Sequence, residues 1–174
     1  KEIAERTFNP RLGIVGGISI LGTSGIVEPM SEKALIDTIE VEMNVKKAEN
    51  PNILIMTPGN YGADFLSRYY GIDIDRAVKC SNFIGASVDM AVKAGFKKIL
   101  FIGHIGKLVK VAGGIMDTHS KNADCRMEIM ITAALKFTED IKLLRTVAEC
   151  STTDAAIELL KSNGLLEPVM SEIT

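Results

Sequence analysis

Four short apolar runs, each followed by a loop rich in small or polar residues, alternate with segments of helical periodicity. The runs are residues 12–20 (LGIVGGISI), 52–57 (NILIMT), 76–82 (RAVKCSN) and 97–105 (KKILFIGHI). Strands that alternate with helices favour a parallel sheet with right-handed crossover connections. The sequence therefore predicts an α/β fold, a Rossmann-like parallel sheet flanked by helices.

The longest segment between two of these runs, residues 31–50, has clear helix signals. Ser31 is a suitable N-cap, and apolar residues recur at four-residue intervals, at Leu35, Ile39 and Met43. Apolar residues also alternate over 39–45, as they would in a strand. Because the segment is long and lies between two predicted strands, we expect a helix.

Two further helices are predicted over residues 60–71 and 83–95. Each segment ends in glycine, Gly71 or Gly95, the residue most common just past a helix C-terminus. The second helix should bury one face, formed by Ile84, Val88, Ala91 and Val92.

After Gly106 the strand signals stop and helical patterns continue. We expect helices near 107–112, 123–136, 139–150 and 153–163, the second with Met127, Met130, Ile131 and Ala134 facing inward. The predicted organisation is an α/β domain over residues 1–138 and a C-terminal helical segment over 139–174 that packs on it.

Composition narrows the class of protein. Apolar residues make up 47% of the 174 and charged residues 24%, and the net charge is −2. Because the sequence contains no basic block, we do not expect nucleic acid as a partner. No apolar run reaches the roughly 18 residues of a membrane span. Three widely spaced cysteines form neither a disulfide framework nor a metal-binding pair, so a reducing cytoplasm fits best.

Ligands of open parallel sheets bind beyond the carboxyl ends of the strands. The four loops at those ends read GGISILGTSGIVEP, TPGNYG, KCSNFIG and GHIGKLVK. Their small residues let backbone groups approach a ligand closely. The first loop lacks the GxGxxG spacing of a dinucleotide fingerprint, so a tight structural turn and a nucleotide-binding loop both stay open.

Polar residues in the last of these loops are candidates for chemistry. Lys107 and Lys110 follow a strand and begin a predicted helix, which favours an anion there, although a solvated basic face fits as well. The two histidines, His104 and His119, could act as acid, base or metal ligand, and His104 could instead be a buried core residue. Cys80 is either a nucleophile or a small buried side chain.

Several long strings together resemble the CbiD family. They are NPRLGIVGGISILGTSGIVEPMSE, TPGNYG, VKCSNFIG and GHIGKLVKVAGGIMDTHS, and they span roughly residues 9–130. The family contains the cobalt-precorrin-5B C(1)-methyltransferases of anaerobic cobalamin synthesis. The resemblance implies transfer of a methyl group from S-adenosyl-L-methionine to ring carbon 1 of a cobalt-containing corrinoid. Because family members are longer and the chain lacks an initiator Met, we expect an N-terminal part to be absent.

The resemblance does not assign a catalytic residue, so the roles are hypotheses drawn from the matching strings. His104 is the candidate base. The candidate cofactor-binding residues are Gly16, Gly17, Gly22, Thr23, Gly25, Asn60 and Asn82. The candidate substrate-binding residues, which would meet the carboxylates of the corrinoid, are Lys79, Lys107, Lys110, His119 and Arg126. No resident metal is expected, since the cobalt belongs to the substrate.

Three alternatives stay open beside this interpretation. One is a nucleotide-dependent oxidoreductase on a Rossmann-like sheet. Another is a cobalt-handling protein that uses His104 and His119. The third is a non-catalytic corrinoid-binding domain, active only with a missing half. A homo-oligomer is also left open.

Overall fold

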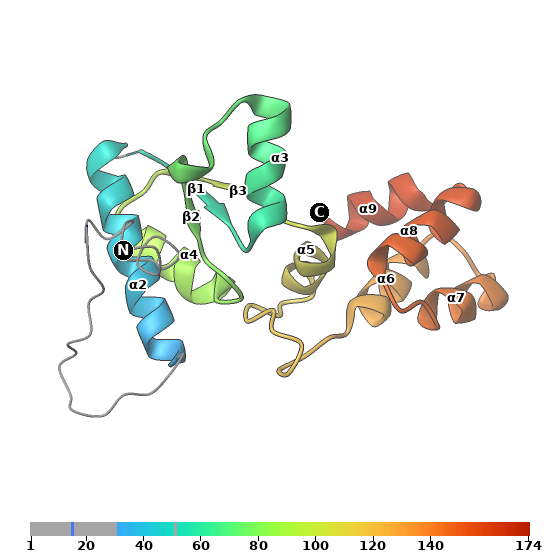
Figure 1. The fold of residues 1–174 in the computed structure, drawn as a ribbon. Coiled ribbons are helices and arrows are strands. Elements are labelled where there is room, and N and C mark those ends of the chain that lie inside the picture. The colour runs from blue at the N-terminus through green and yellow to red at the C-terminus, as the bar shows by residue number, and fades with distance from the viewer. Residues whose placement is uncertain (1–14, 16–30, 51) are drawn as a thin grey trace.

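The computed structural model describes residue 15, residues 31–50 and residues 52–174 (Figure 1). Their sheet has three parallel strands in the order β2-β1-β3. The strands are β1 (Ile53–Thr57), β2 (Ala77–Lys79) and β3 (Lys98–Phe101). This arrangement confirms the predicted parallel α/β sheet. Apart from residue 15, the first predicted strand, residues 12–20, lies outside the described residues.

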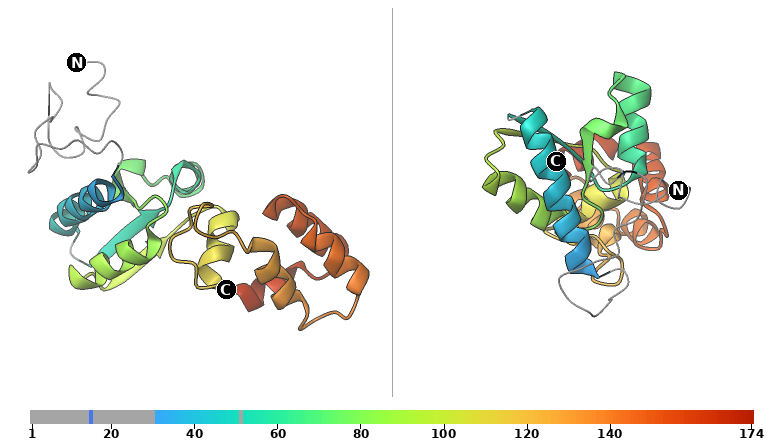
Figure 2. Two further views of the ribbon diagram at one scale, coloured as in Figure 1. Left: turned by 90° about the horizontal axis from the view of Figure 1, so that it is seen from below. Right: turned by 60° about the vertical axis from the view of Figure 1, so that its left-hand side comes forward.

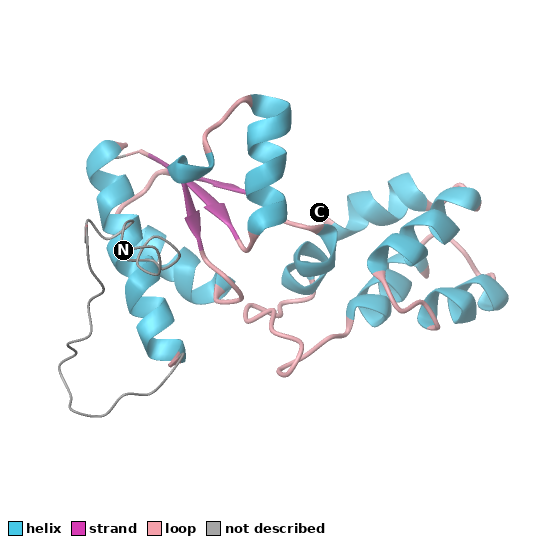
Figure 3. Ribbon diagram, viewed as in Figure 1, coloured by secondary structure: helices cyan, strands magenta, loops and turns pink. Residues whose placement is uncertain are grey.

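The sheet is covered on both sides by helices (Figures 1 and 3). Helices α2 (Glu32–Glu49) and α4 (Ile84–Lys93) pack on one face and on each other. Helix α3 (Asn60–Tyr70) lies on the other face, and a short 3-10 helix, η2 (Ile74–Arg76), leads into β2. The core between the sheet and the first two helices consists of Ile39, Met43, Leu54, Met56, Val78, Ala91 and Phe96.

The N-terminus of α2 is capped by the residue that the sequence predicts, and charged residues stabilise both ends. The Ser31 hydroxyl accepts a hydrogen bond from the backbone N–H of Ala34 at 3.4 Å. Glu32 lies in the first turn, and Lys46 and Lys47 lie in the last, where their charges complement the helix dipole.

Helix α3 depends on two glycines. Gly71 adopts a left-handed conformation (φ 62°), and its N–H caps the carbonyl groups of Leu66 and Ser67. Gly62 faces the strand ends, where an added Cβ would lie 2.3 Å from both the Ile102 carbonyl oxygen and the Thr57 hydroxyl. Only a residue without a side chain lets the first turn of α3 approach the sheet this closely.

The predicted buried face of α4 is partly wrong. Ile84 and Ala91 are buried, but Val88 is 37% exposed and Val92 is 67% exposed, and Ser87 is buried instead. The helix therefore packs through positions i, i+3 and i+7. The small Ser87 and Ala91 side chains let α4 lie close to α2 and the sheet.

Five helices follow the sheet and extend the molecule to one side (Figures 1 and 2). They are α5 (Ile105–Ala112), α6 (Arg126–Ala134), α7 (Ile141–Ala148), α8 (Thr153–Ser162) and α9 (Leu166–Ile173). They share a second core, which consists of Val109, Met127, Met130, Ala133, Ala134, Leu143, Leu144, Val147, Ala156, Leu160 and Val169. The prediction did not include α9. The predicted division of the chain at residue 138 stays a prediction.

The loop between α5 and α6 returns to the sheet. The backbone carbonyl of Met116 accepts a hydrogen bond from the Gly85 N–H at 3.1 Å. The Thr118 N–H donates to the backbone carbonyl of Asn82 at 3.0 Å. Phe83 and Asp117 form an isolated antiparallel bridge. These contacts place the α5–α6 loop beside the carboxyl end of β2. Among the described helices, none has the length and apolar character needed to cross a membrane.

Candidate functional site

A pocket of about 530 Å³ lies at the carboxyl ends of the strands. It is formed by the starts of α3, α5, α6 and α8, the β2–α4 loop and the α5–α6 loop. The residues that line it are Tyr61, Asn82, His104, Gly106, Lys107, Lys110, Thr118, His119, Ser120, Arg126 and Asp154. Helix N-termini carry partial positive charge, so their convergence favours an anionic ligand.

The pocket brings together many of the side chains singled out from the sequence, namely Asn82, His104, Lys107, Lys110, His119 and Arg126. Lys79 and Asn60 do not line it. They contact each other instead, because the Lys79 ammonium donates to the Asn60 side-chain oxygen at 3.0 Å. The candidate glycine-rich loop, with Gly16, Gly17, Gly22, Thr23 and Gly25, lies outside the described residues.

Lys107 lies half-buried between two of the strand-end loops. Its Nζ donates to Asn82 Oδ1 at 2.7 Å and to the Pro58 carbonyl at 3.5 Å. None of the ion pairs among the described residues includes Lys107. Burial lowers the pKa of its ammonium, and Lys110 adds to this, while Cys80 and Asp117 oppose it.

Asn82 positions the Lys107 side chain. Its Oδ1 also accepts a hydrogen bond from the Thr118 hydroxyl at 3.3 Å, so one amide oxygen joins α5 to the α5–α6 loop. The preceding residue, Ser81, has a left-handed backbone (φ 53°), which is unfavourable for a residue with a side chain. Such strain is often found in functional loops.

Lys110 has a different environment from Lys107, although it lies only one turn further along α5. Its side chain is 5% exposed. Its Nζ donates to the carbonyl groups of Ala123 at 2.8 Å and Thr118 at 3.3 Å, and the Asp124 carboxylate lies 3.7 Å away. Lys110 therefore holds the α5–α6 loop in place.

Arg126 is paired with Asp124 through two hydrogen bonds. Nε donates to Oδ1 at 2.5 Å and Nη2 donates to Oδ2 at 2.8 Å. The hydrogen bond from Arg126 holds the pKa of the Asp124 carboxyl below its usual range. An anion in the pocket would compete with Asp124 for the guanidinium.

The two histidines are held in the same way. Nδ1 of His104 accepts a hydrogen bond from the Gly106 N–H at 3.2 Å, and Nδ1 of His119 accepts one from the Lys121 N–H at 3.1 Å. Nε2 of His104 lies 3.9 Å from the Asp154 carboxylate. The His104 ring also packs against Tyr61, with ring centroids 5.3 Å apart.

Several residues that line the pocket were not predicted from the sequence. Tyr61 could have been found, because it follows Asn60 in a loop already considered. Thr118 could have been found as well, because it precedes His119 in a string already considered. Asp154 had no local signal, since it reaches the pocket only through tertiary packing. Gly106 leaves room for the side chains packed around it, because an added Cβ would lie 3.4 Å from the Thr153 hydroxyl and 3.7 Å from Arg126 Nη1.

Cys80 is a buried thiol beside this pocket. It is fully buried, and burial raises its pKa to about 12. Because the thiolate is the nucleophilic form, the structure favours the small buried residue over the nucleophile.

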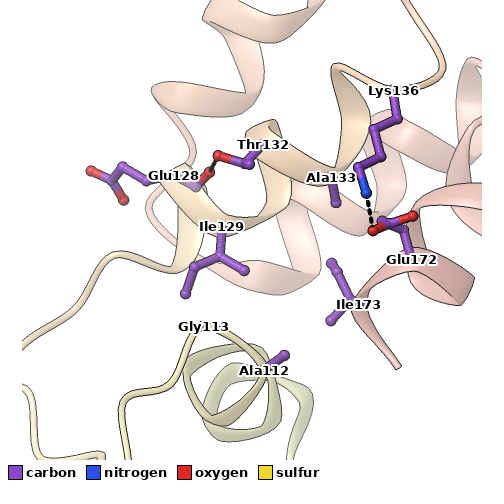
Figure 4. A pocket seen from close by; sticks show the side chains of 9 residues that line it. All are labelled: Ala112, Gly113, Glu128, Ile129, Thr132, Ala133, Lys136, Glu172 and Ile173. Carbon is purple, nitrogen blue, oxygen red and sulfur yellow. Dashed lines mark hydrogen bonds and ion pairs between the residues drawn. The ribbon is translucent and has the colours of Figure 1, made fainter.

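A second cavity of about 340 Å³ lies between α5, α6 and α9 (Figure 4). Its floor is apolar, formed by Ala112, Ile129, Ala133 and Ile173, and an ion pair between Lys136 and Glu172 lies at its edge. It contains none of the candidate residues. Within the part of the chain that the structure describes, no cluster of histidine, cysteine and acidic side chains could hold a metal ion.

Two family models match the chain. The model described as CbiD matches residues 1–29, and the model described as CbiD, C-terminal domain, matches residues 117–174. The chain therefore belongs to the CbiD family. Thr118, His119, Ser120, Arg126 and Asp154 come from the second matched segment, so that segment supplies one wall of the pocket.

Two curated relatives carry the same name. The chain is 54% identical over 97% of its length to a cobalt-precorrin-5B C(1)-methyltransferase of Ruminiclostridium cellulolyticum, and covers 44% of that protein. It is 44% identical over 99% of its length to the protein of the same name from Methanococcus aeolicus, of which it covers 46%. The chain thus spans less than half the length of these relatives. No solved structure matches it.

Proposed function

We propose that this chain is part of an S-adenosyl-L-methionine-dependent methyltransferase that acts on ring carbon 1 of cobalt-precorrin-5B. Family membership and the names of the relatives support this function. Those names give no support to the oxidoreductase or the cobalt-handling alternative.

The observation that carries the proposal is a cation-lined pocket at the ends of the strands, which contains an ammonium group without a carboxylate partner among the described residues. A corrinoid intermediate carries several acetate and propionate side chains. The pocket can meet such carboxylates with Lys107, with the two histidines and with helix N-termini.

Methyl transfer requires few other groups from the protein. The sulfonium of the cofactor already activates the methyl group, so the main requirement is to hold donor and acceptor in line. The cobalt is part of the substrate. We assign Asn82, Asn60 and the glycine-rich loop with Gly16, Gly17, Gly22, Thr23 and Gly25 to the cofactor.

The cationic candidates divide by their contacts. Lys107 and His119 can meet a substrate carboxylate directly. Arg126 can do so only in competition with Asp124, and Lys110 acts through the loop that it holds. Lys79 does not line the pocket and contacts Asn60 instead, so it would meet only a more distant carboxylate.

Titration calorimetry of the intact protein that carries these residues tests the cofactor. Saturable binding of S-adenosylhomocysteine, with no binding of NADH, would support the methyltransferase. Binding of NADH alone would support the oxidoreductase, and binding of neither would refute the cofactor assignment.

Absorbance titration with two corrinoids tests the pocket. Cobyrinic acid presents free carboxylates, and cobinamide presents amides in their place. We expect Lys107→Met to weaken cobyrinic acid binding about tenfold, about 1.4 kcal/mol, and to leave cobinamide binding unchanged. Lys142→Met, an exposed substitution on α7, is the matched control. Equal affinities of Lys107→Met and the control for cobyrinic acid would remove the pocket from the substrate site.

A further inference from the structure

Helix α3 carries a concentration of exposed aromatic side chains. They are the three tyrosines of the chain and one of its six phenylalanines, namely Tyr61, Phe65, Tyr69 and Tyr70. Their exposed fractions are 75%, 43%, 66% and 65%, in that order. Large aromatic side chains are normally buried in a core or an interface. Several of them exposed on one helix therefore indicate a binding surface.

The attachment of α3 to the sheet does not account for these side chains. The helix packs through Gly62, where a Cβ would clash with the strand ends, and through Leu66, which is fully buried. Its C-terminus is capped by Gly71. Since other residues provide the packing and the cap, the aromatic side chains are free to contact a ligand.

Three of the four aromatic residues share one side of the helix. Tyr61, Phe65 and Tyr69 are spaced four residues apart, and we call the surface that they form the aromatic side of α3. The rings of Phe65 and Tyr69 contact each other, with centroids 4.8 Å apart. From Tyr61 to Tyr69 the helix advances about 12 Å. The aromatic side therefore extends over two turns.

One end of the aromatic side belongs to the pocket at the ends of the strands. Tyr61 lines that pocket, and its ring contacts the ring of His104, with centroids 5.3 Å apart and planes tilted by 54°. From there α3 runs away from α5 along the sheet (Figure 1). Because Tyr61 is 75% exposed, most of its ring is open to a ligand that enters the pocket.

The pocket and the aromatic side suit different parts of one ligand. Lys107 and the helix N-termini in the pocket attract carboxylates. Aromatic side chains instead attract conjugated or apolar surface. A ligand that satisfies both is a conjugated ring system with carboxylates at its rim, and the corrinoid of the proposed function has this chemistry.

We propose that the aromatic side of α3, beginning at Tyr61, contacts the ring system of the corrinoid while the pocket holds its carboxylates. The inference rests on the proposed methyltransferase function and adds a site for the part of the substrate that receives the methyl group. Asn60, which we assign to the cofactor, directly precedes Tyr61. A ring edge on Tyr61 would therefore lie close to the methyl donor and to His104, the candidate base.

Three probes separate the ring system from its carboxylates. Cobyrinic acid has both, cobinamide has the ring system with amides, and citrate has carboxylates without a ring. Tyr61→Ser in the intact protein removes an exposed aromatic ring, and serine and tyrosine have similar helix propensities, so α3 should stay folded. We expect Tyr61→Ser to bind both corrinoids about tenfold more weakly and to bind citrate as the wild type does.

Two variants control for effects other than the loss of a ring at this position. Tyr61→Phe keeps the ring and should bind both corrinoids with nearly wild-type affinity. Tyr70→Ser removes an equally accessible tyrosine from the same helix. Nine residues span about two and a half turns, so Tyr70 lies on the opposite side of α3 from Tyr61. We expect its corrinoid affinities to be unchanged.

The possible results distinguish this inference from the proposed function. Unchanged cobinamide affinity in Tyr61→Ser, or an equal loss in Tyr70→Ser, would overturn the inference and leave the carboxylate test with Lys107→Met standing. If Tyr61→Ser changed the molecular mass in sedimentation but not the corrinoid affinity, the aromatic side would contact a protein chain instead. A wild type that bound neither corrinoid would refute the proposed function itself.

Fluorine NMR of protein labelled with 3-fluorotyrosine tests the contact without any loss of affinity. Tyr61→Phe and Tyr70→Phe each remove one resonance and so assign it. We expect cobinamide to shift the Tyr61 resonance and to leave the Tyr70 resonance in place, because only Tyr61 lines the pocket. Equal shifts of the two resonances, or no shift of either, would contradict a ring contact at Tyr61.

Discussion

Lys110 Nζ donates a hydrogen bond to the carbonyl oxygen of Ala123 at 2.8 Å, and this contact closes the loop between α5 and α6. Lys107, three residues earlier on the same helix, donates instead to the side chain of Asn82 at 2.7 Å. The two lysines look equivalent in the sequence. The contacts of Lys110 give it a structural role, and those of Lys107 leave it available to a ligand.

Replacement of Lys110 by methionine tests the structural role. It would leave the carbonyl groups of Thr118 and Ala123 without their donor, and we expect a loss of about 1–3 kcal/mol in the free energy of unfolding. Urea denaturation measures this loss. Lys142→Met, at an exposed position on α7, should change stability by less than about 0.5 kcal/mol. If both variants were equally stable, Lys110 would not hold the loop.

The buried thiol of Cys80 predicts a loss of stability at alkaline pH. Its pKa is about 12 in the folded protein against an ordinary value of 9.0. Above pH 9 the unfolded chain loses the thiol proton and the folded chain keeps it. Stability present below pH 9 should therefore fall by roughly 1.4 kcal/mol per pH unit toward pH 12.

Comparison with Cys80→Ala isolates this effect from other titrating groups. The free energy of unfolding of each protein is measured at pH 8 and pH 10 under reducing conditions. We expect the wild type to lose more than the variant by about 1.4 kcal/mol. Parallel changes in the two proteins would mean that the thiol titrates normally in the fold.

Gly62 should not tolerate a side chain. An alanine Cβ would lie 2.3 Å from the Ile102 carbonyl oxygen, a backbone atom that cannot move aside cheaply. We expect Gly62→Ala to destabilise the protein by about 1–3 kcal/mol, despite the better helix propensity of alanine.

Gly59→Ala is the matched control for this substitution. Its backbone is extended (φ −178°), and an added Cβ would meet no atom within 4 Å. We expect its thermal midpoint to stay close to that of the wild type. A similar fall of the thermal midpoint in Gly62→Ala and Gly59→Ala would show that the close approach of α3 to the end of β3 does not cause the destabilisation.

Release of Arg126 from Asp124 should strengthen anion binding. Asp124→Asn removes the charged partner that holds the guanidinium through two hydrogen bonds. We expect the affinity for citrate, a small tricarboxylate probe, to rise several-fold by calorimetry. Asp89→Asn, exposed on α4, is the control. Weaker citrate binding in Asp124→Asn would mean that the pair positions Arg126 for the anion.

The sequence by itself determined the order of elements and many of their ends. Strands β1 to β3 fall within their predicted ranges, and Ser31 and Gly71 cap α2 and α3 as expected. These features depend on residues close together in the chain, where periodicity and capping act. The pattern that resembles the CbiD family also lies in contiguous strings.

Only the tertiary structure decided which side chains meet. It buried Ser87 where Val88 and Val92 were expected, and it brought Asp154 to within 3.9 Å of His104, fifty residues earlier. It also separated the roles of Lys107 and Lys110. Such contacts depend on how helices pack across two cores, which local periodicity does not encode, and a charged side chain takes its role from the acceptors that packing places around it.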